Sequence, residues 1–150
     1  MDLILWRHAE AEDGTPDLER RLTAKGHEQA ARVAAWLLQR LPAKFVVLAS
    51  PARRAQETAQ ALGVPFRTVT ALAPGAAVRY ILGAADWPGR KSAVVVVGHQ
   101  PDLGRLAALL VSGTEASWSV KKGGLWWLSD RVRDAGAQVV VRAVVAPDLI

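Results

Sequence analysis

The sequence has 150 residues, of which 51% are hydrophobic and 22% charged, and it contains no cysteine. A chain of this length and composition is typical of one globular domain, here residues 1–150, and not of a disordered segment. The missing cysteines exclude a disulfide framework and thiolate chemistry. No apolar run approaches the roughly 20 residues of a membrane-spanning helix. Asp2 is followed at once by a strand-like run, so we expect no signal peptide, no membrane contact and a cytoplasmic bacterial location.

The net charge is +5, and the arginines and lysines that produce it are scattered along the chain. No long basic run with interleaved aromatic residues is present, which argues against nucleic acid as a partner. A basic surface of this kind favours acidic or phosphorylated partners.

Apolar runs and turn residues predict that strands alternate with helices. We expect strands over residues 3–6, 45–49, 66–69 and 93–97. We expect helices from an N-cap at Thr23 to about Arg40, from an N-cap at Ser50 to Leu62, and over residues 75–82 and 101–110. A hairpin of residues 124–129 and 138–145, turning at 134–136, ends the chain. This order predicts an α/β fold, a three-layer α/β/α sandwich with a mostly parallel sheet and an antiparallel C-terminal hairpin.

Cationic or titratable side chains follow three of the expected strands. Ligands of open α/β sheets bind beyond the carboxyl ends of the strands, so these side chains should meet at one edge. They are Arg7 and His8 after the first strand, Ser50 with Arg53 or Arg54 after the second, and His99 after the fourth. Two guanidinium groups can grip the oxygens of a phosphoryl group, and one imidazole could attack phosphorus while the other donates a hydrogen bond to an oxygen.

Four stretches resemble signatures of the histidine phosphatase superfamily, which includes the cofactor-dependent phosphoglycerate mutases. Arg7-His8-Ala9 resembles its Arg-His-Gly motif, with alanine in place of the usual glycine. Residues 22–30, LTAKGHEQA, are similar to its Leu-Thr-x-x-Gly-x-x-Gln-Ala stretch. Residues 50–59, SPARRAQETA, resemble its Ser-Pro-x-x-Arg-Ala-x-x-Thr segment, and residues 97–99, VGH, match the late Gly-His motif. The resemblance covers about residues 1–110 in the right order.

The resemblance implies a role for each residue at the sheet edge. His8 would be the nucleophile that becomes phosphohistidine. Arg7, Arg54 and His99 would form the phosphate pocket, with Ser50 as a further phosphate-binding residue, and Arg54 is selected over Arg53 by the motif. The resemblance also implies a phosphoglycerate mutase-like fold and catalysis without a metal or other cofactor.

The length of the chain narrows the branch of the superfamily. Mutases and many phosphatases of this superfamily carry a long helical insertion that covers the site, but here only residues 69–91 are available for one. A single domain without a large cap, with RHAE and GHQPDL motifs, resembles the SixA-like phosphohistidine phosphatases. An open site would suit a phosphorylated protein, such as a histidine-phosphotransfer domain, better than a free metabolite.

The family's general acid cannot be carried over by motif. Asp17 and Glu19, in the loop after the first strand, are the main candidates, and the alternatives are Glu10, Glu12 and Glu57.

Other functions stay open at this point. The chain could hydrolyse small phosphate monoesters, or it could be a phosphate-binding module without catalysis. The spacing of His8, His27 and His99 does not resemble a metal ligand set, and we expect His27 on the helix surface. Of the pair Trp126-Trp127, one ring should pack inward and the other outward, and Lys121-Lys122 is interpreted as a solvated turn.

Overall fold

The sheet has six strands, and four of them run parallel. The computed structural model describes residues 1–133 and 136–150. The strands are β1 (Asp2–Arg7), β2 (Phe45–Ala49), β3 (Arg67–Thr68), β4 (Ala93–Gly98), β5 (Leu125–Arg133) and β6 (Gly136–Val145). Their order is β3-β2-β4-β1-β5-β6, with β5 antiparallel to β1 and β6 antiparallel to β5. The expected parallel sheet with an antiparallel hairpin is therefore confirmed, while the turn residues Asp134 and Ala135 lie outside the described residues.

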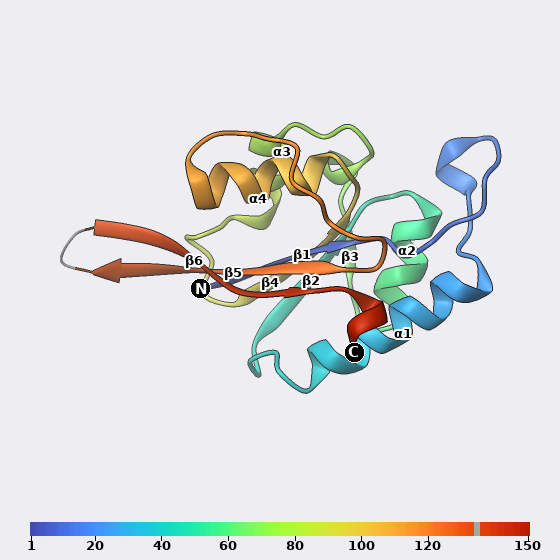
Figure 1. Ribbon diagram of the computed structural model, residues 1–150, viewed down its shortest axis with the longest axis horizontal. Coiled ribbons are helices and arrows are strands. Elements are labelled where there is room, and N and C mark those ends of the chain that lie inside the picture. The colour runs from blue at the N-terminus through green and yellow to red at the C-terminus, as the bar shows by residue number, and fades with distance from the viewer. Residues whose placement is uncertain (134–135) are drawn as a thin grey trace.

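Helices cover both faces of this sheet (Figure 1). They are α1 (Ala24–Leu38), α2 (Arg53–Gln60), α3 (Val78–Ala85) and α4 (Asp102–Ser112), with short 3-10 helices η1 (Asp17–Glu19), η2 (Thr70–Leu72) and η3 (Pro147–Leu149). None of the helices in the described part of the chain is long and apolar enough to cross a membrane.

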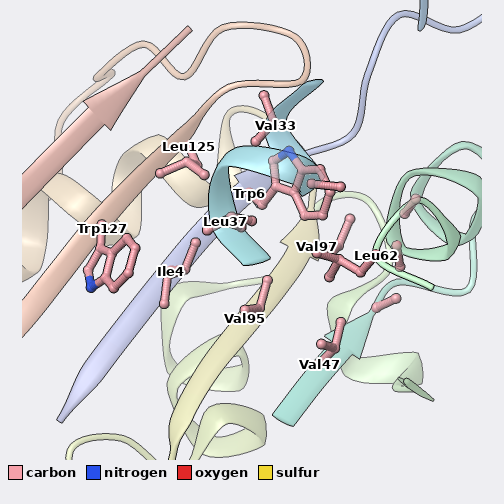
Figure 2. Close-up of a cluster of buried hydrophobic side chains, with 14 of the residues drawn as sticks. Ile4, Trp6, Val33, Leu37, Val47, Leu62, Val95, Val97, Leu125 and Trp127 are labelled. Carbon is pink, nitrogen blue, oxygen red and sulfur yellow. The ribbon is translucent and has the colours of Figure 1, made fainter. Parts of the chain in front are cut away.

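Alternate residues of the central strands build two separate cores. On β1, Ile4 and Trp6 face α1 and α2, whereas Leu3 and Leu5 face α3 and α4. Figure 2 shows the first core, in which Trp6 packs among side chains of the sheet and of α1. All six residues of β4 are buried, as expected for a strand that is covered on both faces. The expected three-layer α/β/α sandwich is thus confirmed.

The pair Trp126-Trp127 divides between the two faces. Trp127 is buried in the α1 side of the sheet and meets Trp36 edge to face, with 6.0 Å between ring centroids. Trp126 lies on the α4 side and stacks on Trp118 at 5.3 Å. Both rings pack against core clusters of the protein, so packing explains them, as the sequence indicated.

Two helices begin later than expected. We predicted Ser50 as the N-cap of α2, but the helix begins at Arg53, because Ala52 still has an extended backbone with φ of −63° and ψ of 135°. The Ser50 hydroxyl accepts the N–H of Ala52 ahead of the helix and also binds His99. We predicted α3 from residue 75, but Gly75 has a φ of 88° and its N–H donates to the carboxylate of Asp102 at 2.9 Å. That contact holds a turn in place of the first helical turn.

Candidate active site

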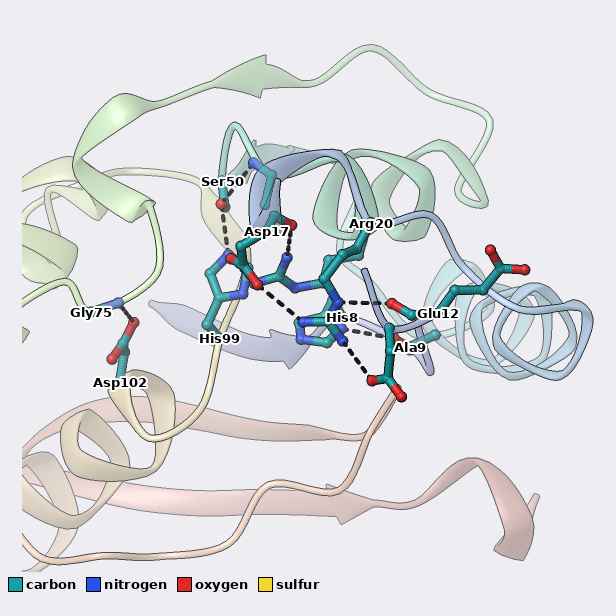
Figure 3. A network of polar contacts seen from close by, with 12 residues as sticks. His8, Ala9, Glu12, Asp17, Arg20, Ser50, Gly75, His99 and Asp102 are labelled. Carbon is teal, nitrogen blue, oxygen red and sulfur yellow. Dashed lines mark hydrogen bonds and ion pairs between the residues drawn. The ribbon is translucent and has the colours of Figure 1, made fainter. Parts of the chain in front are cut away.

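The two histidines of the site are placed by the pairing of two neighbouring strands. In the β1–β4 ladder Arg7 lies opposite Gly98, and the N–H of His8 donates to the Gly98 carbonyl at 3.0 Å. His8 and His99 follow directly, and their ring centroids are 5.2 Å apart (Figure 3). His8 is 8% exposed and His99 is 3% exposed. The expected meeting of strand ends therefore brings both rings into one buried site.

The ring of His8 has one nitrogen bound and one available. Its Nδ1 lies 2.7 Å from the Ala9 carbonyl oxygen, which can only accept a hydrogen bond, so Nδ1 carries the ring proton. Nε2 then keeps its lone pair. Burial, and after it the positive charges of Arg54, Arg7 and Arg20, lower the pKa of His8 from 6.5 to about 4. The ring is thus neutral at physiological pH, which is the form that a nucleophile requires.

The ring of His99 is held by Ser50. The Nε2 of His99 and the Oγ of Ser50 are 2.7 Å apart, and the same Oγ accepts the N–H of Ala52 at 3.1 Å. When the Ser50 hydroxyl donates to Nε2, Nδ1 of His99 carries the ring proton. Ser50 is fully buried. A direct bond from Ser50 to a phosphate stays a prediction, whereas its contact with His99 is observed.

Of the two adjacent arginines on α2, Arg54 points into the site. It is 4% exposed, and its Nη1 and Nη2 donate to the carbonyl and the carboxylate of Asp17 at 2.8 and 3.1 Å. Arg53 is exposed and pairs with Glu57 on its own helix at 3.5 Å. The structure therefore gives Arg54, and not Arg53, the position that the motif implied for a phosphate ligand.

Unpaired hydrogen-bond donors concentrate in this site. Five buried side-chain atoms of the described residues have no hydrogen-bond partner, and three of them are Arg7 Nε, Arg54 Nε and His99 Nδ1. Buried polar groups without partners are costly, so a cluster of them calls for an explanation. Three N–H groups beside a neutral imidazole can be satisfied together by the oxygens of a phosphoryl group.

The candidate acids differ in where they lie. Asp17 contacts Arg54 and also accepts from Arg20 at 3.1 Å, and the Arg20 bond is the largest cause that lowers the pKa of Asp17. Glu19 is exposed at the end of η1. The other three bind groups elsewhere: Glu10 accepts from Thr23, Glu12 from Arg21, and Glu57 from the N–H of Leu22. Among these candidates, Asp17 is thus the carboxylate that contacts Arg54.

Two further residues hold the segment that follows His8, and we did not assign them a role from the sequence. Thr58 accepts the N–H of Ala9 at 3.0 Å and donates to the Arg54 carbonyl at 2.7 Å, so it joins the His8 segment to α2. Gln29 accepts the N–H of Glu10 at 2.9 Å. Both occupy fixed positions of the quoted motifs, and that was the available signal.

Gly26 allows α1 to approach the loop that follows His8. A Cβ built on Gly26 would lie 2.0 Å from the carbonyl oxygen of Glu10, which is backbone and cannot swing away. We predict that Gly26→Ala lowers the free energy of unfolding by about 2–3 kcal/mol. Gly83→Ala is the matched control, because a Cβ on Gly83 in α3 meets nothing within 4 Å. It should raise stability by about 0.5–1 kcal/mol, and equal effects in urea denaturation would contradict the steric explanation.

The lowered histidine pKa values predict how stability changes with pH. In the unfolded chain His8 and His99 take up protons near pH 6.5, but in the folded chain their pKa values are about 4 and about 3, chiefly because both rings are buried. The unfolded state therefore binds more protons between these limits, and the free energy of unfolding should fall as the pH drops from 6.5 to about 3. NMR titration of the ring resonances checks this, and a His8 midpoint near 6.5 would contradict it.

Metal ligands do not gather in the described part of the chain. Among residues 1–133 and 136–150, no three His, Asp or Glu side chains could hold a metal ion together. His27 lies exposed in the first turn of α1, as expected.

The fold is that of a three-layer α/β protein whose site gathers two histidines and two arginines at the carboxyl ends of parallel strands. The family model of the histidine phosphatase superfamily (branch 1) matches residues 3–74, which include three of the four motifs. An uncharacterised protein of Mycobacterium tuberculosis is 36% identical over 120 residues, which are 74% of either chain. Another, from a Picosynechococcus species, is 35% identical over 137 residues, 83% of this chain and 82% of its own. The chain belongs to the histidine phosphatase superfamily.

Solved structures agree with this assignment. A chain from Nakamurella multipartitia, named as a candidate phosphohistidine phosphatase SixA, is 30% identical with a TM-score of 0.75 and covers 97% of this chain and 96% of its own. The protein histidine phosphatase SixA complexed with tungstate is 23% identical with a TM-score of 0.84, covers 99% of both chains, and shows a shared fold. A mycobacterial glucosyl-3-phosphoglycerate phosphatase, 21% identical with a TM-score of 0.73, covers 95% of this chain and 97% of its own, and also shares the fold. Membership of this superfamily supports phosphatase activity.

Proposed function

We propose that the protein is a phosphohistidine phosphatase that removes the phosphoryl group from a histidine of another protein. The observation that carries the proposal is the group of unpaired donors on Arg7, Arg54 and His99 beside the neutral ring of His8. These N–H groups can donate hydrogen bonds to the oxygens of a phosphoryl group whose phosphorus lies next to a nucleophilic nitrogen.

The reaction proceeds in two displacements. Nε2 of His8 attacks phosphorus and forms a P–N bond, while the bond from phosphorus to the substrate imidazole breaks and that imidazole takes a proton from solvent. Water then attacks phospho-His8, a P–O bond forms, the P–Nε2 bond breaks, and inorganic phosphate leaves. Arg7, Arg54 and His99 hold the phosphoryl oxygens in both steps. These side chains supply the positive charge and the hydrogen bonds that stabilise the phosphoryl oxygens, so the proposed reaction needs no metal ion or other cofactor.

Asp17 suits the second step better than the first. Its lowered pKa keeps the carboxylate ionised at neutral pH, so it is placed to accept a proton from the attacking water. A proton donor matters less in the first step, because an imidazole leaves phosphorus more readily than an alkoxide does. We therefore propose Asp17 as the acid–base group of the site and assign no catalytic role to Glu19.

A phosphorylated protein is the proposed substrate because the segment between β3 and β4 contains only η2 and α3. No long insertion is present there to enclose a small molecule. The likeness to the two SixA structures supports the same substrate class, a phosphorylated protein such as a histidine-phosphotransfer domain. A cytoplasmic location, where such proteins act, is part of the proposal.

A substrate panel tests the proposal directly. Purified protein should release phosphate from a phosphohistidine protein with a kcat/KM at least tenfold above that for any sugar, nucleotide or amino-acid phosphate. Vanadate should inhibit, and a chelator should have no effect. Higher rates on a small phosphate monoester would assign the second candidate function, and failure to trap phosphate on His8 would indicate a binding module.

A further inference from the structure

The turn at residues 120–124 is fixed to the catalytic end of β1. Four hydrogen bonds of 2.8–3.0 Å join the two segments. With the donor first, they are Gly123 N–H to His8 carbonyl, Trp6 Nε1 to Gly123 carbonyl, Arg7 N–H to Gly124 carbonyl, and Arg7 Nη1 to Val120 carbonyl. The solvated turn expected at Lys121-Lys122 is therefore anchored beside the nucleophile.

A surface groove lies between this turn and α1. Its volume is about 410 Å³, and its lining includes Arg7, Lys121 and Lys122, together with Lys25 from the first turn of α1. Asp148 of η3 supplies the one carboxylate among its lining residues. Arg7 lines this groove and also belongs to the candidate phosphate site, so the two are neighbours. We call Lys25, Lys121 and Lys122 the lysine rim.

The lysine rim carries positive charge that the described part of the chain does not neutralise. The arginines on the other side of the site are all in ion pairs: Arg20 and Arg54 with Asp17, Arg21 with Glu12, and Arg53 with Glu57. None of the ion pairs among the described residues involves Lys25, Lys121 or Lys122. Four cations and one carboxylate leave the groove with three net positive charges.

We propose that the lysine rim binds acidic side chains that flank the phosphorylated histidine of a protein substrate. This inference rests on the proposed function, since it describes how a protein would present its phosphohistidine to His8. Fixed cations on one side of the site would steer and orient an acidic surface. The groove can hold several side chains at once, as the surface of a substrate protein would present them. A free phosphohistidine has no flanking side chains and would gain no affinity from the groove.

Direct binding of two peptides tests the rim without any need for turnover. One fluorescent peptide carries a histidine flanked by glutamates, and the other carries the same histidine flanked by glutamines. In fluorescence anisotropy at low salt, the glutamate peptide should bind about tenfold more tightly to the unmodified chain. Lys121→Glu with Lys122→Glu should remove this difference, and so should about 0.5 M salt.

Lys44→Glu with Lys91→Glu is the matched control. Both lysines are exposed and precede β2 and β4, at the opposite end of the parallel strands, and the pair changes the net charge by the same amount. The control should keep the preference for glutamate. Equal binding of both peptides would contradict the proposed role of the lysine rim. So would an equal loss of the preference for glutamate in both double variants.

Phosphorylated forms of the same peptides separate this inference from the proposed function. The glutamate form should be hydrolysed with a kcat/KM about tenfold above that of the glutamine form. If both peptides bind equally and are hydrolysed at the same rate, the proposed role of the lysine rim is rejected and the phosphatase proposal stands. If the glutamate peptide binds more tightly but neither peptide is hydrolysed, the phosphatase proposal is rejected and the proposed binding role of the lysine rim stands.

Discussion

Replacing His8 by alanine should lower kcat by a factor on the order of 10⁴ or more, because the proposed reaction then has no nucleophile. The fold should persist. The backbone N–H and C=O of His8 bind Gly98 and Gly123, and these bonds do not need the imidazole. Phosphate release and thermal melting of the same preparation measure both effects.

His27→Ala is the control for this substitution, since it removes an exposed histidine on α1 and should keep full activity. Incubation with a phosphohistidine protein labelled in its phosphoryl group should leave label on the unmodified chain and on the His27 variant, and none on the His8 variant. Retained turnover in the His8 variant would exclude the proposed mechanism.

Arg54→Ala should lower kcat/KM by a factor on the order of 10²–10³, because it removes the buried guanidinium to which the proposed mechanism assigns the phosphoryl oxygens. Arg54→Lys should recover little of this loss, because an ammonium group cannot reproduce the planar set of donors. The substitution also removes the two hydrogen bonds from Arg54 to Asp17 and leaves the bond from Arg20 to that carboxylate.

Arg53→Ala provides a control one residue away. Its guanidinium is exposed and pairs with Glu57, so its loss should change kcat/KM less than about twofold. Comparable losses in the Arg53 and Arg54 variants would show that overall positive charge, and not the position of Arg54, produces the effect.

The sequence predicts the sheet and the meeting of side chains at its edge, because apolar runs and strand ends are local signals. Each of β1, β2 and β4 contains a continuous apolar run. β1 ends at Arg7, and Ser50 and His99 directly follow β2 and β4. The register that sets His8 beside His99 joins residues 91 positions apart, but the rule that ligands bind at the carboxyl ends of parallel strands was enough to bring them together.

Contacts between residues that lie far apart in the sequence were harder to predict. The local pattern indicated a helix cap for the hydroxyl of Ser50 but gave no sign of its contact with His99, a residue 49 positions away. Asp17 could not be separated from Glu19 because the loop after β1 has no periodic pattern. Thr58 pairs with Ala9 across 49 residues, and no local preference indicates such a bond.

The pairing of β1 with β4 has a consequence for how proteins of this design can diversify. The spacing of the two imidazoles is set by one hydrogen-bonded ladder, Leu3 to Arg7 against Val94 to Gly98. Surface segments such as residues 69–92 can therefore lengthen or shorten, and change what the site accepts, without moving one ring relative to the other. A deletion within β1 is different, since a shift of one residue would turn His8 to the opposite face of the sheet. The strands thus fix the geometry of the two imidazoles, whereas the surface segments determine which substrate the site accepts.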